Sequence, residues 1–404
     1  MNDRLGPLKS FVPPQTPALV VRRATLMRNL AAMQAAADAA GAALRAHGKM
    51  HKCSALGRLQ VEGGAVGLCC QTVGEAEAFA AAGIGDLLIT SPAPPWAAAR
   101  IAALAAQGVK IGVVADDEGQ IERLSAAAVA AGATIEVVVD IDLGLHRTGA
   151  APGEAVGLAG EAQNSPGLRW RGVQAYAGDL QHIADLAVRK ARVEAAQDKL
   201  AAVVADLRAA GLDPEVVTGA GTGTYALDLA SGAFNEIQAG SYAFMDVEYE
   251  DCGAPGGGPW PFEAALFLAA SVVSDRHKTH VTCDLGLKAH SVDGPPARVV
   301  GGAPEGSTWR AMGDEHGAVF HPEMMAKLRA LGREAVDAIG MLDADPAVER
   351  PADLPNVGDI VWLQPGHCDP TANLHDVLYV VDEDGSYEVW PIDARRVSPT
   401  APRP

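Results

Sequence analysis

The stretch AVGLCCQTVGEAEAFAAAGIGDLLIT (residues 65–90) decides the fold of this chain. It begins with an apolar run at 65–70, continues as an alanine-rich segment, and ends in a second apolar run at 86–90. In the middle segment the apolar residues recur at helical spacing, which predicts a helix. Continuous apolar runs joined by a helix are typical of parallel strands that are buried on both faces.

The same alternation recurs along the first 250 residues. Eight strand-like runs end in polar or glycine-rich corners: 42–47, 65–70, 86–90, 110–115, 134–142, 168–176, 215–220 and 236–241. Alanine-rich helical segments follow most of these runs, for example at 72–83 and 189–211. Eight such units predict an α/β fold in which a parallel sheet closes into a (β/α)8 TIM barrel. An open doubly wound sheet is the competing architecture.

The pattern changes after this region. The Gly/Pro cluster at 253–261 indicates a linker or crossover. Strand-like runs follow, at 265–274, 280–287, 359–366 and 377–390, and apart from 321–340 no long amphipathic helix is predicted between them. The last run, VLYVVDEDGSYEVW, has Asp-Gly between two alternating segments and predicts a hairpin. We therefore expect a barrel domain over 16–252 and a β-rich C-terminal domain formed by 1–15 plus 253–404.

The composition excludes several classes of function. A net charge of −18 argues against a nucleic-acid or anionic-membrane partner, since phosphate backbones need a basic surface. The six cysteines form no CxxC pair, which favours reduced thiols. The N-terminus has no apolar signal region, and no eighteen apolar residues run together. We expect a soluble, cytoplasmic protein.

Polar residues gather where the predicted barrel strands end, which is where such barrels carry their chemistry. The basic stretch LRAHGKMHKC (44–53) places His47, Lys49 and His51 after the first strand. Further candidates belong to later strands, namely Gln71, Arg147, Tyr176, His182 and Gln238.

The glycine-rich stretch TGAGTGT (218–224) follows the seventh strand. Glycines let backbone N–H groups approach an anion, and threonine hydroxyls add donors. The spacing fits neither a Walker loop nor a dinucleotide fingerprint, and a bare turn is the alternative. Because loops after the seventh and eighth strands of such barrels often bind phosphate, a phosphorylated ligand is favoured.

In the second domain, PGHCDPTANLHD (365–376) places His367 and Asp369 two positions apart. In an extended chain both side chains would point to one face, and an imidazole with a carboxylate suits a divalent cation. A His–Asp hydrogen bond in a loop is the alternative, and Cys368 is expected to be structural. A lysine, a phosphate site and a metal together suggest pyridoxal phosphate chemistry.

The chain resembles the fold-type III pyridoxal-phosphate enzymes related to D-threonine aldolase, 3-hydroxy-D-aspartate aldolase and D-serine dehydratase. The resemblance is carried by nine blocks in order: TPALVV, HGKMHK, CCQTVGEAEAF, GVQAYAGDLQH, TGAGTGTY, EIQAGSYAFMD, DLGLKAHSVD, DEHG and PGHCDPTANLHD. It implies an alanine-racemase-like N-terminal barrel.

The resemblance also implies roles for residues at the cofactor. Lys49 would carry pyridoxal 5'-phosphate, Arg147 would bind the phenolic oxygen, and Tyr176 would orient the ring. Residues that would bind the cofactor besides these are His47, Gln71, Thr218, Gly219, Gly221, Thr222, Gly223, Gln238, Gly240, Ser241 and Tyr242. From the local sequence, Lys52 is expected to be a solvated cation at a helix start, and Arg45, which shares the parity of Lys49 in an extended chain, is expected to support the anionic side of the cofactor.

This chain departs from the family pattern at three positions. Thr148 stands where relatives usually have a cysteine, and Ala220 where they have a third glycine. A methyl group at Ala220 is expected to require a negative φ. Gln238 stands where related barrels place an arginine beside the pyridine nitrogen, so a neutral partner would leave that nitrogen unprotonated.

The resemblance implies retro-aldol cleavage of a D-3-hydroxy-amino acid, of the D-threonine or 3-hydroxy-D-aspartate type, to glycine and an aldehyde. His367 and Asp369 would hold a divalent cation, Mn²⁺ first and otherwise Mg²⁺, Co²⁺ or Zn²⁺, on the β-hydroxyl. His182 would be the general base, and His290, Ser291 and Asp293 would lie near the substrate. A homodimer is expected. The alternatives are a dehydratase that yields a keto acid and ammonia, and a non-catalytic carrier of the cofactor.

Overall fold

A computed structural model describes residues 4–332 and 335–395 of the chain. Its contacts divide the chain into two compact units. Of the described residues, the barrel unit contains 29–242, 251–261 and 392–395. The sheet unit contains 4–28, 243–250, 262–332 and 335–391.

Eight parallel strands close the described part of the barrel unit into a ring. They are β2 (Ala43–His47), β3 (Gly67–Cys70), β4 (Asp86–Ile89), β5 (Lys110–Ala115), β6 (Ile135–Asp140), β7 (Leu168–Ala175), β8 (Val216–Gly219) and β9 (Glu236–Ile237). Each pairs in parallel with the next, and β2 pairs with β9 to complete the ring. The predicted (β/α)8 barrel is confirmed, and the open doubly wound sheet is wrong.

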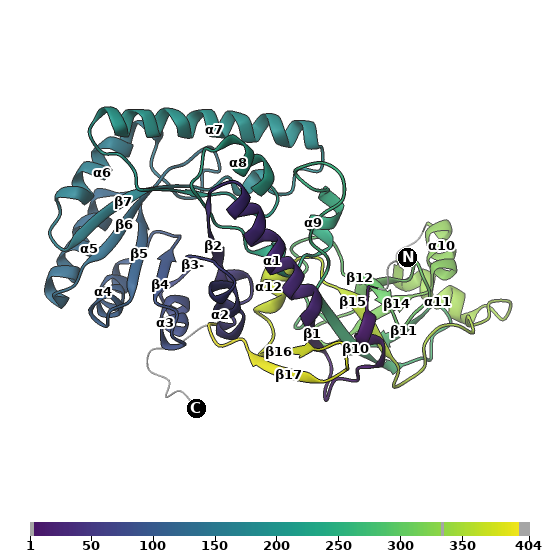
Figure 1. Cartoon of the computed structure of the whole chain (residues 1–404). Coiled ribbons are helices and arrows are strands. Elements are labelled where there is room, and N and C mark those ends of the chain that lie inside the picture. The colour runs from purple at the N-terminus through teal and green to yellow at the C-terminus, as the bar shows by residue number, and fades with distance from the viewer. Residues whose placement is uncertain (1–3, 333–334, 396–404) are drawn as a thin grey trace. The chain divides into compact units, whose positions relative to one another are not determined.

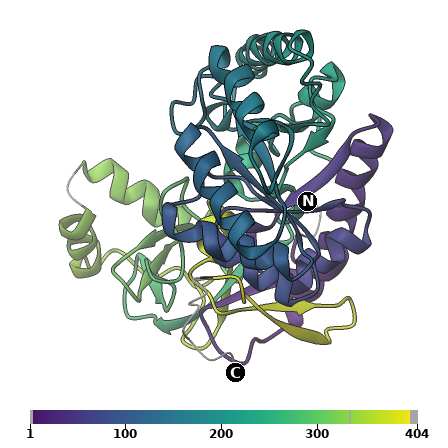
Figure 2. The ribbon, with the colours of Figure 1, turned by 90° about the vertical axis from the view of Figure 1, so that its left-hand side faces the viewer.

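Helices alternate with these strands and surround them (Figures 1 and 2). They are α2 (Ser54–Glu62), α3 (Val73–Ala81), α4 (Ala98–Ala106), α5 (Glu118–Ala131), α6 (Ala155–Asn164), α7 (Leu186–Ala209) and α8 (Tyr225–Ser231). The sequence sets several of their starts. Thr72, Asp117 and Asp185 are N-caps whose side-chain oxygens accept backbone N–H groups from the first turn. Two helices have residues in both units, α1 (Arg23–Ala39) and α9 (Val247–Cys252).

The sheet unit is built on strands in the order β11-β14-β13-β12-β15-β10-β1-β16-β17. Their bounds are β1 (Ala18–Arg22), β10 (Leu266–Ser274), β11 (His280–Cys283), β12 (Arg298–Gly301), β13 (Thr308–Ala311), β14 (Gly317–Phe320), β15 (Ile360–Gln364), β16 (Val377–Val381) and β17 (Tyr387–Pro391). Because β11 also pairs with β10, the strands from β10 to β15 close into an antiparallel barrel. The unit also contains the helices α10 (Pro322–Leu331), α11 (Ala335–Ala344) and α12 (Cys368–Ala372).

The hairpin predicted around Asp-Gly is confirmed. Strands β16 and β17 pair antiparallel over five residues each. The backbone N–H of Asp382 donates to the oxygen of Ser386 at 2.8 Å. Gly385 has φ +84°, a conformation that favours glycine.

The structure draws the boundary between the units differently from the predicted 16–252 and 1–15 plus 253–404. Strand β1 pairs antiparallel with β10 and in parallel with β16, so it belongs to the sheet unit. An apolar run such as Ala-Leu-Val-Val suits either sheet, and its partners lie more than 240 residues further along the chain. The local sequence therefore carries no signal that distinguishes the two assignments.

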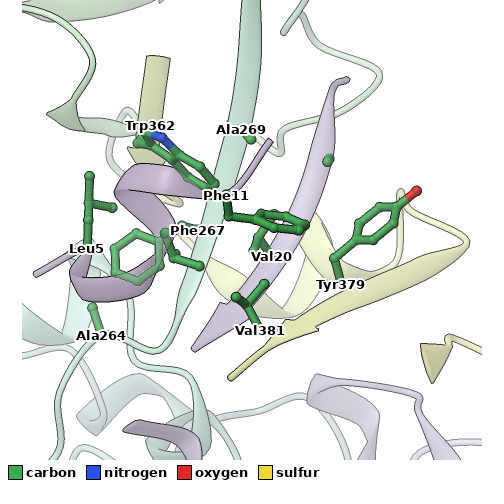
Figure 3. Close-up of a cluster of buried hydrophobic side chains, with 11 residues drawn as sticks. Leu5, Phe11, Val20, Ala264, Phe267, Ala269, Trp362, Tyr379 and Val381 are labelled. Atoms are coloured by element: carbon green, nitrogen blue, oxygen red, sulfur yellow. The ribbon is translucent and has the colours of Figure 1, made fainter. Parts of the chain in front are cut away.

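Strand β1 is fixed in the sheet unit by a buried apolar cluster (Figure 3). Val20 on β1 belongs to this cluster with Phe267 on β10 and Val381 on β16. The other members are Leu5, Leu8, Phe11, Ala18, Ala264, Ala269, Trp362 and Tyr379.

Within the described residues, no helix combines the length and the apolar character that a membrane crossing requires.

Candidate cofactor and metal sites

Lys49 lies on a tight turn that directly follows barrel strand β2. The turn η2 (Gly48–Met50) begins after His47, whose Nδ1 accepts the backbone N–H of Lys49 at 3.4 Å. A Cβ at Gly48 would lie 2.7 Å from the ring of Phe79, so only glycine fits. A Cβ at Gly240 would lie 3.1 Å from the backbone oxygen of His47. The Lys49 turn therefore packs directly against the segment that follows β9.

His47 is held through both ring nitrogens. Its Nε2 lies 3.0 Å from Oγ1 of Thr90, at the end of β4, and the Thr90 hydroxyl donates to the backbone oxygen of Cys70. Because Nδ1 accepts an N–H group, we assign the proton to Nε2 and a neutral imidazole to His47. This predicted cofactor residue is thus preorganised at the barrel mouth.

Lys52 is not the solvated cation that was predicted. Its ammonium group pairs with the carboxylate of Glu75, whose side chain is only 1% exposed. Glu75 also accepts the backbone N–H of Gln71 at 2.7 Å. Glu75 thus fixes the start of the loop after β3, and Lys52 neutralises it.

Arg45 lies toward the opposite end of the barrel from Lys49. It pairs with Asp86 at 2.6 Å and with Glu236 at 3.0 Å, and these carboxylates belong to the first residues of β4 and β9. Burial opposes the charge on the guanidinium, but the two carboxylates outweigh it and raise the pKa of Arg45. The structure gives Arg45 a role in closing the barrel, away from the predicted cofactor.

His51 is fully buried, and both of its ring nitrogens contact residues that follow the Lys49 turn. Its Nδ1 accepts the backbone N–H of Cys53 at 2.9 Å, and its Nε2 lies 3.2 Å from Oε1 of Gln60. The Gln60 amide in turn donates to the hydroxyl of Tyr242 at 3.4 Å. Tyr242 is 1% exposed, and burial raises the pKa of its hydroxyl.

A buried amide network crosses the barrel interior. Nε2 of Gln238 donates to Oε1 of Gln174 at 3.1 Å and to Oγ1 of Thr218 at 3.0 Å. Nε2 of Gln174 donates to the carboxylate of Asp140 at 2.9 Å. Burial raises the pKa of Asp140, and the hydrogen bond from Gln174 opposes that rise. Thr218, predicted to bind phosphate, therefore directs its hydroxyl toward Gln238.

Gln174, Asp140 and Thr90 were missed at the level of sequence. Each is a polar residue at or next to the end of a strand that is otherwise apolar. Gln174 joins two of the missed residues, since its Nε2 also donates to the backbone oxygen of Thr90 at 3.1 Å. Polar residues at the ends of apolar strands were the available signal.

The glycine-rich loop after β8 presents three consecutive backbone N–H groups. Within the described residues, the N–H groups of Ala220, Gly221 and Thr222 make no hydrogen bond to the protein. Successive N–H groups of this kind form a concavity for an anion. Gly223 differs, because its N–H donates to Oε1 of Gln181 at 2.9 Å. In this loop the N–H groups of Ala220 to Thr222 are therefore open to a ligand, whereas that of Gly223 is used within the protein.

The expectation for Ala220 is wrong. Its φ is +62°, in the left-handed region that favours glycine. A left-handed residue within a turn can direct adjacent backbone N–H groups toward one point. The loop thus keeps the backbone of a glycine while it carries a methyl group.

The loop after β9 completes the cup around those N–H groups. The backbone N–H of Tyr242 donates to Oγ1 of Thr222 at 3.0 Å. This bond joins the segment of Gly240, Ser241 and Tyr242 to the glycine-rich loop. The sequence predicted that these segments lie together, and the structure brings them together beside the Lys49 turn.

Arg147, Tyr176 and His182 follow β6 and β7. The guanidinium carbon of Arg147 lies 5.7 Å from the centroid of the Tyr176 ring, within the range of a cation–π contact. His182 comes after the turn η5 (Gly178–Leu180), and its backbone oxygen accepts the thiol of Cys252 at 3.1 Å. All three residues lie at the same end of the barrel as Lys49.

The candidate metal ligands lie in the sheet unit. His367 has an extended backbone and precedes α12, but Asp369 lies in the first turn of that helix. The premise of an extended chain through both residues is therefore wrong. Proline at position 370 fits the first turn of a helix, where no backbone N–H is needed, and this signal was not used.

A carboxylate sets the orientation of His367. Its Nδ1 lies 2.9 Å from Oδ2 of Asp293, so we assign the proton to Nδ1 and a lone pair to Nε2. A histidine whose second nitrogen is held by a carboxylate is typical of metal ligands. The donor chemistry of His367 and Asp369 therefore fits a divalent cation. In the described parts of the chain, no group of three or more His, Cys, Asp or Glu residues is arranged to hold one.

The residues around this pair support its loop. Ser291 donates its hydroxyl to Asp293 at 2.6 Å, and Nε2 of His290 accepts the backbone N–H of Gly366 at 3.2 Å. Cys368 is fully buried, and burial raises the pKa of its thiol well above the ordinary value. Its backbone N–H donates to the carboxylate of Asp246 at 2.9 Å. Cys368 is thus structural, and His290 holds the loop from within.

Comparisons with known proteins agree with both halves of this architecture. The family model of the alanine racemase N-terminal domain matches residues 21–248, and that of the serine dehydratase domain matches 265–381. D-threonine aldolase from Arthrobacter sp. is 39% identical over 392 residues, which cover 95% of this chain and 93% of the relative. 3-hydroxy-D-aspartate aldolase from Paracoccus denitrificans (strain Pd 1222) is 40% identical over 390 residues, with coverages of 94% and 92%.

A solved structure shows the same fold over the full length. The crystal structure of D-threonine aldolase from Filomicrobium marinum superposes with a TM-score of 0.82 at 38% sequence identity. The superposition covers 94% of this chain and 96% of that one.

Proposed function

The chain belongs to the family that joins an alanine racemase N-terminal domain to a serine dehydratase domain, and on this premise we propose that it cleaves D-3-hydroxy-amino acids. The substrates would be of the D-threonine or 3-hydroxy-D-aspartate type, and the products glycine and an aldehyde. The D-amino acid aldolases that this chain resembles are carbon–carbon lyases. One observation carries the proposal, namely a lysine turn packed against a cup of N–H groups at the barrel mouth.

The residues at the barrel mouth fit pyridoxal 5'-phosphate. The N–H groups of Ala220, Gly221 and Thr222 suit the phosphate, and the Lys49 amine suits the aldehyde. When bound, the cofactor would supply an electron sink for the bond that breaks at Cα. Arg147 and Tyr176 would fix the cofactor ring, and Gln238 would lie beside the pyridine nitrogen as an uncharged side chain.

The chain's own residues would then divide the proton transfers. His182 would take the proton from the β-hydroxyl of the substrate, since imidazole titrates near neutral pH. Lys49 or a water would return a proton to Cα before glycine leaves. His367 and Asp369 would hold a divalent cation, Mn²⁺ by the family resemblance, to polarise that hydroxyl. A homodimer also follows from the resemblance and is testable by light scattering.

Product analysis tests the proposal. The purified chain would be incubated with pyridoxal 5'-phosphate, Mn²⁺ and either D-threonine or 3-hydroxy-D-aspartate, with L-threonine as the matched control. We expect glycine and aldehyde in equal amounts from a D substrate, and neither from L-threonine. Ammonia with a keto acid would contradict the aldolase and indicate the dehydratase. A chain that binds the cofactor but forms no product would be the carrier.

A further inference from the structure

We infer that Gln181 is a positioning residue that clamps the phosphate-binding loop to the segment bearing His182. The side chain of Gln181 is 2% exposed and makes three hydrogen bonds. Its Oε1 accepts the N–H of Gly223 at 2.9 Å, and its Nε2 donates to Oγ1 of Thr224 at 3.1 Å and to the oxygen of Ala177 at 3.2 Å. This inference rests on the proposed function, because it assigns the loop to phosphate and His182 to proton transfer.

The contact between Gln181 and the loop explains two of its glycines. A Cβ at Gly221 would lie 2.4 Å from Oε1 of Gln181, and a Cβ at Gly223 would lie 1.9 Å from the backbone oxygen of Gln181. The loop thus needs glycine at these positions to approach Gln181. The bond from Gly223 to Gln181 leaves the anion to the N–H groups of Ala220, Gly221 and Thr222.

The clamp continues into the helices outside the barrel. Thr224, whose hydroxyl accepts from Gln181, also accepts the backbone N–H of Asp228 on α8 at its backbone oxygen, at 3.0 Å. Nε2 of Gln197 on α7 donates to the carboxyl group of Asp228 at 2.8 Å. Gln181 is therefore tied through Thr224 to two helices, and the loop is fixed relative to the scaffold of the barrel.

The backbone around Gln181 also positions the neighbouring residue, His182. The backbone N–H of Gln181 donates to Gly178 at 3.3 Å, and the backbone oxygen of His182 accepts the thiol of Cys252. The His182 backbone is thus held on one side by Gln181 and on the other by Cys252. A shift of the phosphate loop would be transmitted to His182 through one residue.

The test compares Gln181→Met, which keeps side-chain length but loses all three hydrogen bonds, with Gln34→Met on the barrel helix α1. Gln34 donates to Asp38 at 2.8 Å and is the matched control for loss of a glutamine hydrogen bond. Hydrogen exchange in the chain without cofactor would report the Gly223 amide. Titration with pyridoxal 5'-phosphate would report affinity, and the pH profile of D-threonine cleavage would report His182.

We expect Gln181→Met to exchange the Gly223 amide faster. It should also bind the cofactor about tenfold more weakly, as the loss of the one hydrogen bond that fixes the Gly223 N–H implies. The acidic limb of its pH profile should also shift, whereas Gln34→Met should match the wild type in all three measurements. Unchanged exchange and unchanged affinity in Gln181→Met would overturn the clamp. If no variant binds the cofactor, the proposed function fails while exchange at Gly223 still decides the clamp.

Discussion

The two lysines of the HGKMHK block differ in what surrounds them. Lys52 neutralises the buried carboxylate of Glu75, so its ammonium serves the fold. Lys49 lies on a turn that packs against Gly240, beside the cup of backbone N–H groups. Replacing either lysine therefore has different consequences. Loss of Lys52 would leave a buried charge without its partner, which is destabilising, whereas loss of Lys49 would remove the proposed point of attachment for the cofactor.

Replacing Ala220 by glycine should increase the stability of the folded chain. A left-handed alanine costs roughly 1–2 kcal/mol, and glycine removes that cost while it adds a smaller penalty from the flexible unfolded chain. We expect Ala220→Gly to raise the free energy of unfolding by up to about 1 kcal/mol, measured by urea denaturation.

A β-branched residue provides the opposite control at this position. Ala220→Val should lower the free energy of unfolding by more than about 1 kcal/mol, since valine tolerates a positive φ poorly. Equal stability of the glycine, alanine and valine forms would show that the loop does not hold the left-handed backbone.

At the residue scale, the spacing of residues along the sequence predicted which ones lie near each other better than it predicted which side chains form contacts. The alternation of a strand placed Arg45 on the same side as His47 and Lys49. It does not reveal toward which end of the barrel the Arg45 side chain extends. Asp86 and Glu236 decide that, and they are remote in sequence. Likewise, the chain around Lys52 gives no sign of the buried Glu75 on the next helix.

Helices α7 and α8 are joined at the buried carboxyl group of Asp228, whose pKa is raised. Burial raises the pKa of Asp228 from its ordinary value of 3.8 to about 6, and hydrogen bonds from Thr224 and Gln197 oppose the rise. Between these two values the folded chain keeps a proton that the unfolded chain has lost. Raising the pH from about 4 to about 6 should therefore lower the free energy of unfolding through this group.

Asp228→Asn should remove this contribution, because an amide does not titrate. We expect the variant to lose stability less steeply than the wild type over that pH interval, measured by urea unfolding at a series of pH values. Asp213→Asn, at an exposed carboxylate paired with Arg208, is the control and should follow the wild type. Parallel curves for the wild type and Asp228→Asn would contradict the assignment.

The loop before α12 depends on Asp293 for the orientation of His367. Carboxylates in this position typically contribute about 10- to 100-fold to metal affinity. We expect Asp293→Asn to weaken Mn²⁺ binding by a factor in that range, measured by calorimetric titration. Asp314→Asn, at an exposed carboxylate of the same unit, should leave the affinity unchanged. Wild-type affinity in Asp293→Asn would show that His367 does not need this partner.

Helices and strands were predictable where the pattern of apolar residues in the sequence was clear. All eight barrel strands fall within the predicted runs because they are continuous apolar segments closed by polar corners. Strand β1 has the same local pattern, but only its distant partners β10 and β16 decide which sheet it joins. Helix α12 is five residues long, too short for any periodicity to reveal it.

At the scale of the whole molecule, the cofactor and the metal should stabilise different units. A ligand that binds only the folded state adds about 2.7 kcal/mol at one hundred times its Kd. We expect pyridoxal 5'-phosphate to slow hydrogen exchange in the loop 218–224 and Mn²⁺ to slow it in 365–376. Protection of 218–224 by Mn²⁺ alone would contradict this separation.

The division of the whole chain was predictable only in outline. The shift from helix–strand alternation to turn-separated strands revealed two architectures. It did not reveal that residues 16–28 and 243–250 belong to the second one. Both are short pieces whose place depends on pairing with strands elsewhere in the chain.

The central claim is that Lys49 carries pyridoxal 5'-phosphate at the barrel mouth. Reduction of the loaded protein with borohydride, followed by peptide mass spectrometry, locates the lysine to which the cofactor is attached. We predict a single pyridoxyl group on Lys49 in the wild type and none in Lys49→Ala. A pyridoxyl group on Lys52, or its persistence in Lys49→Ala, would contradict the claim.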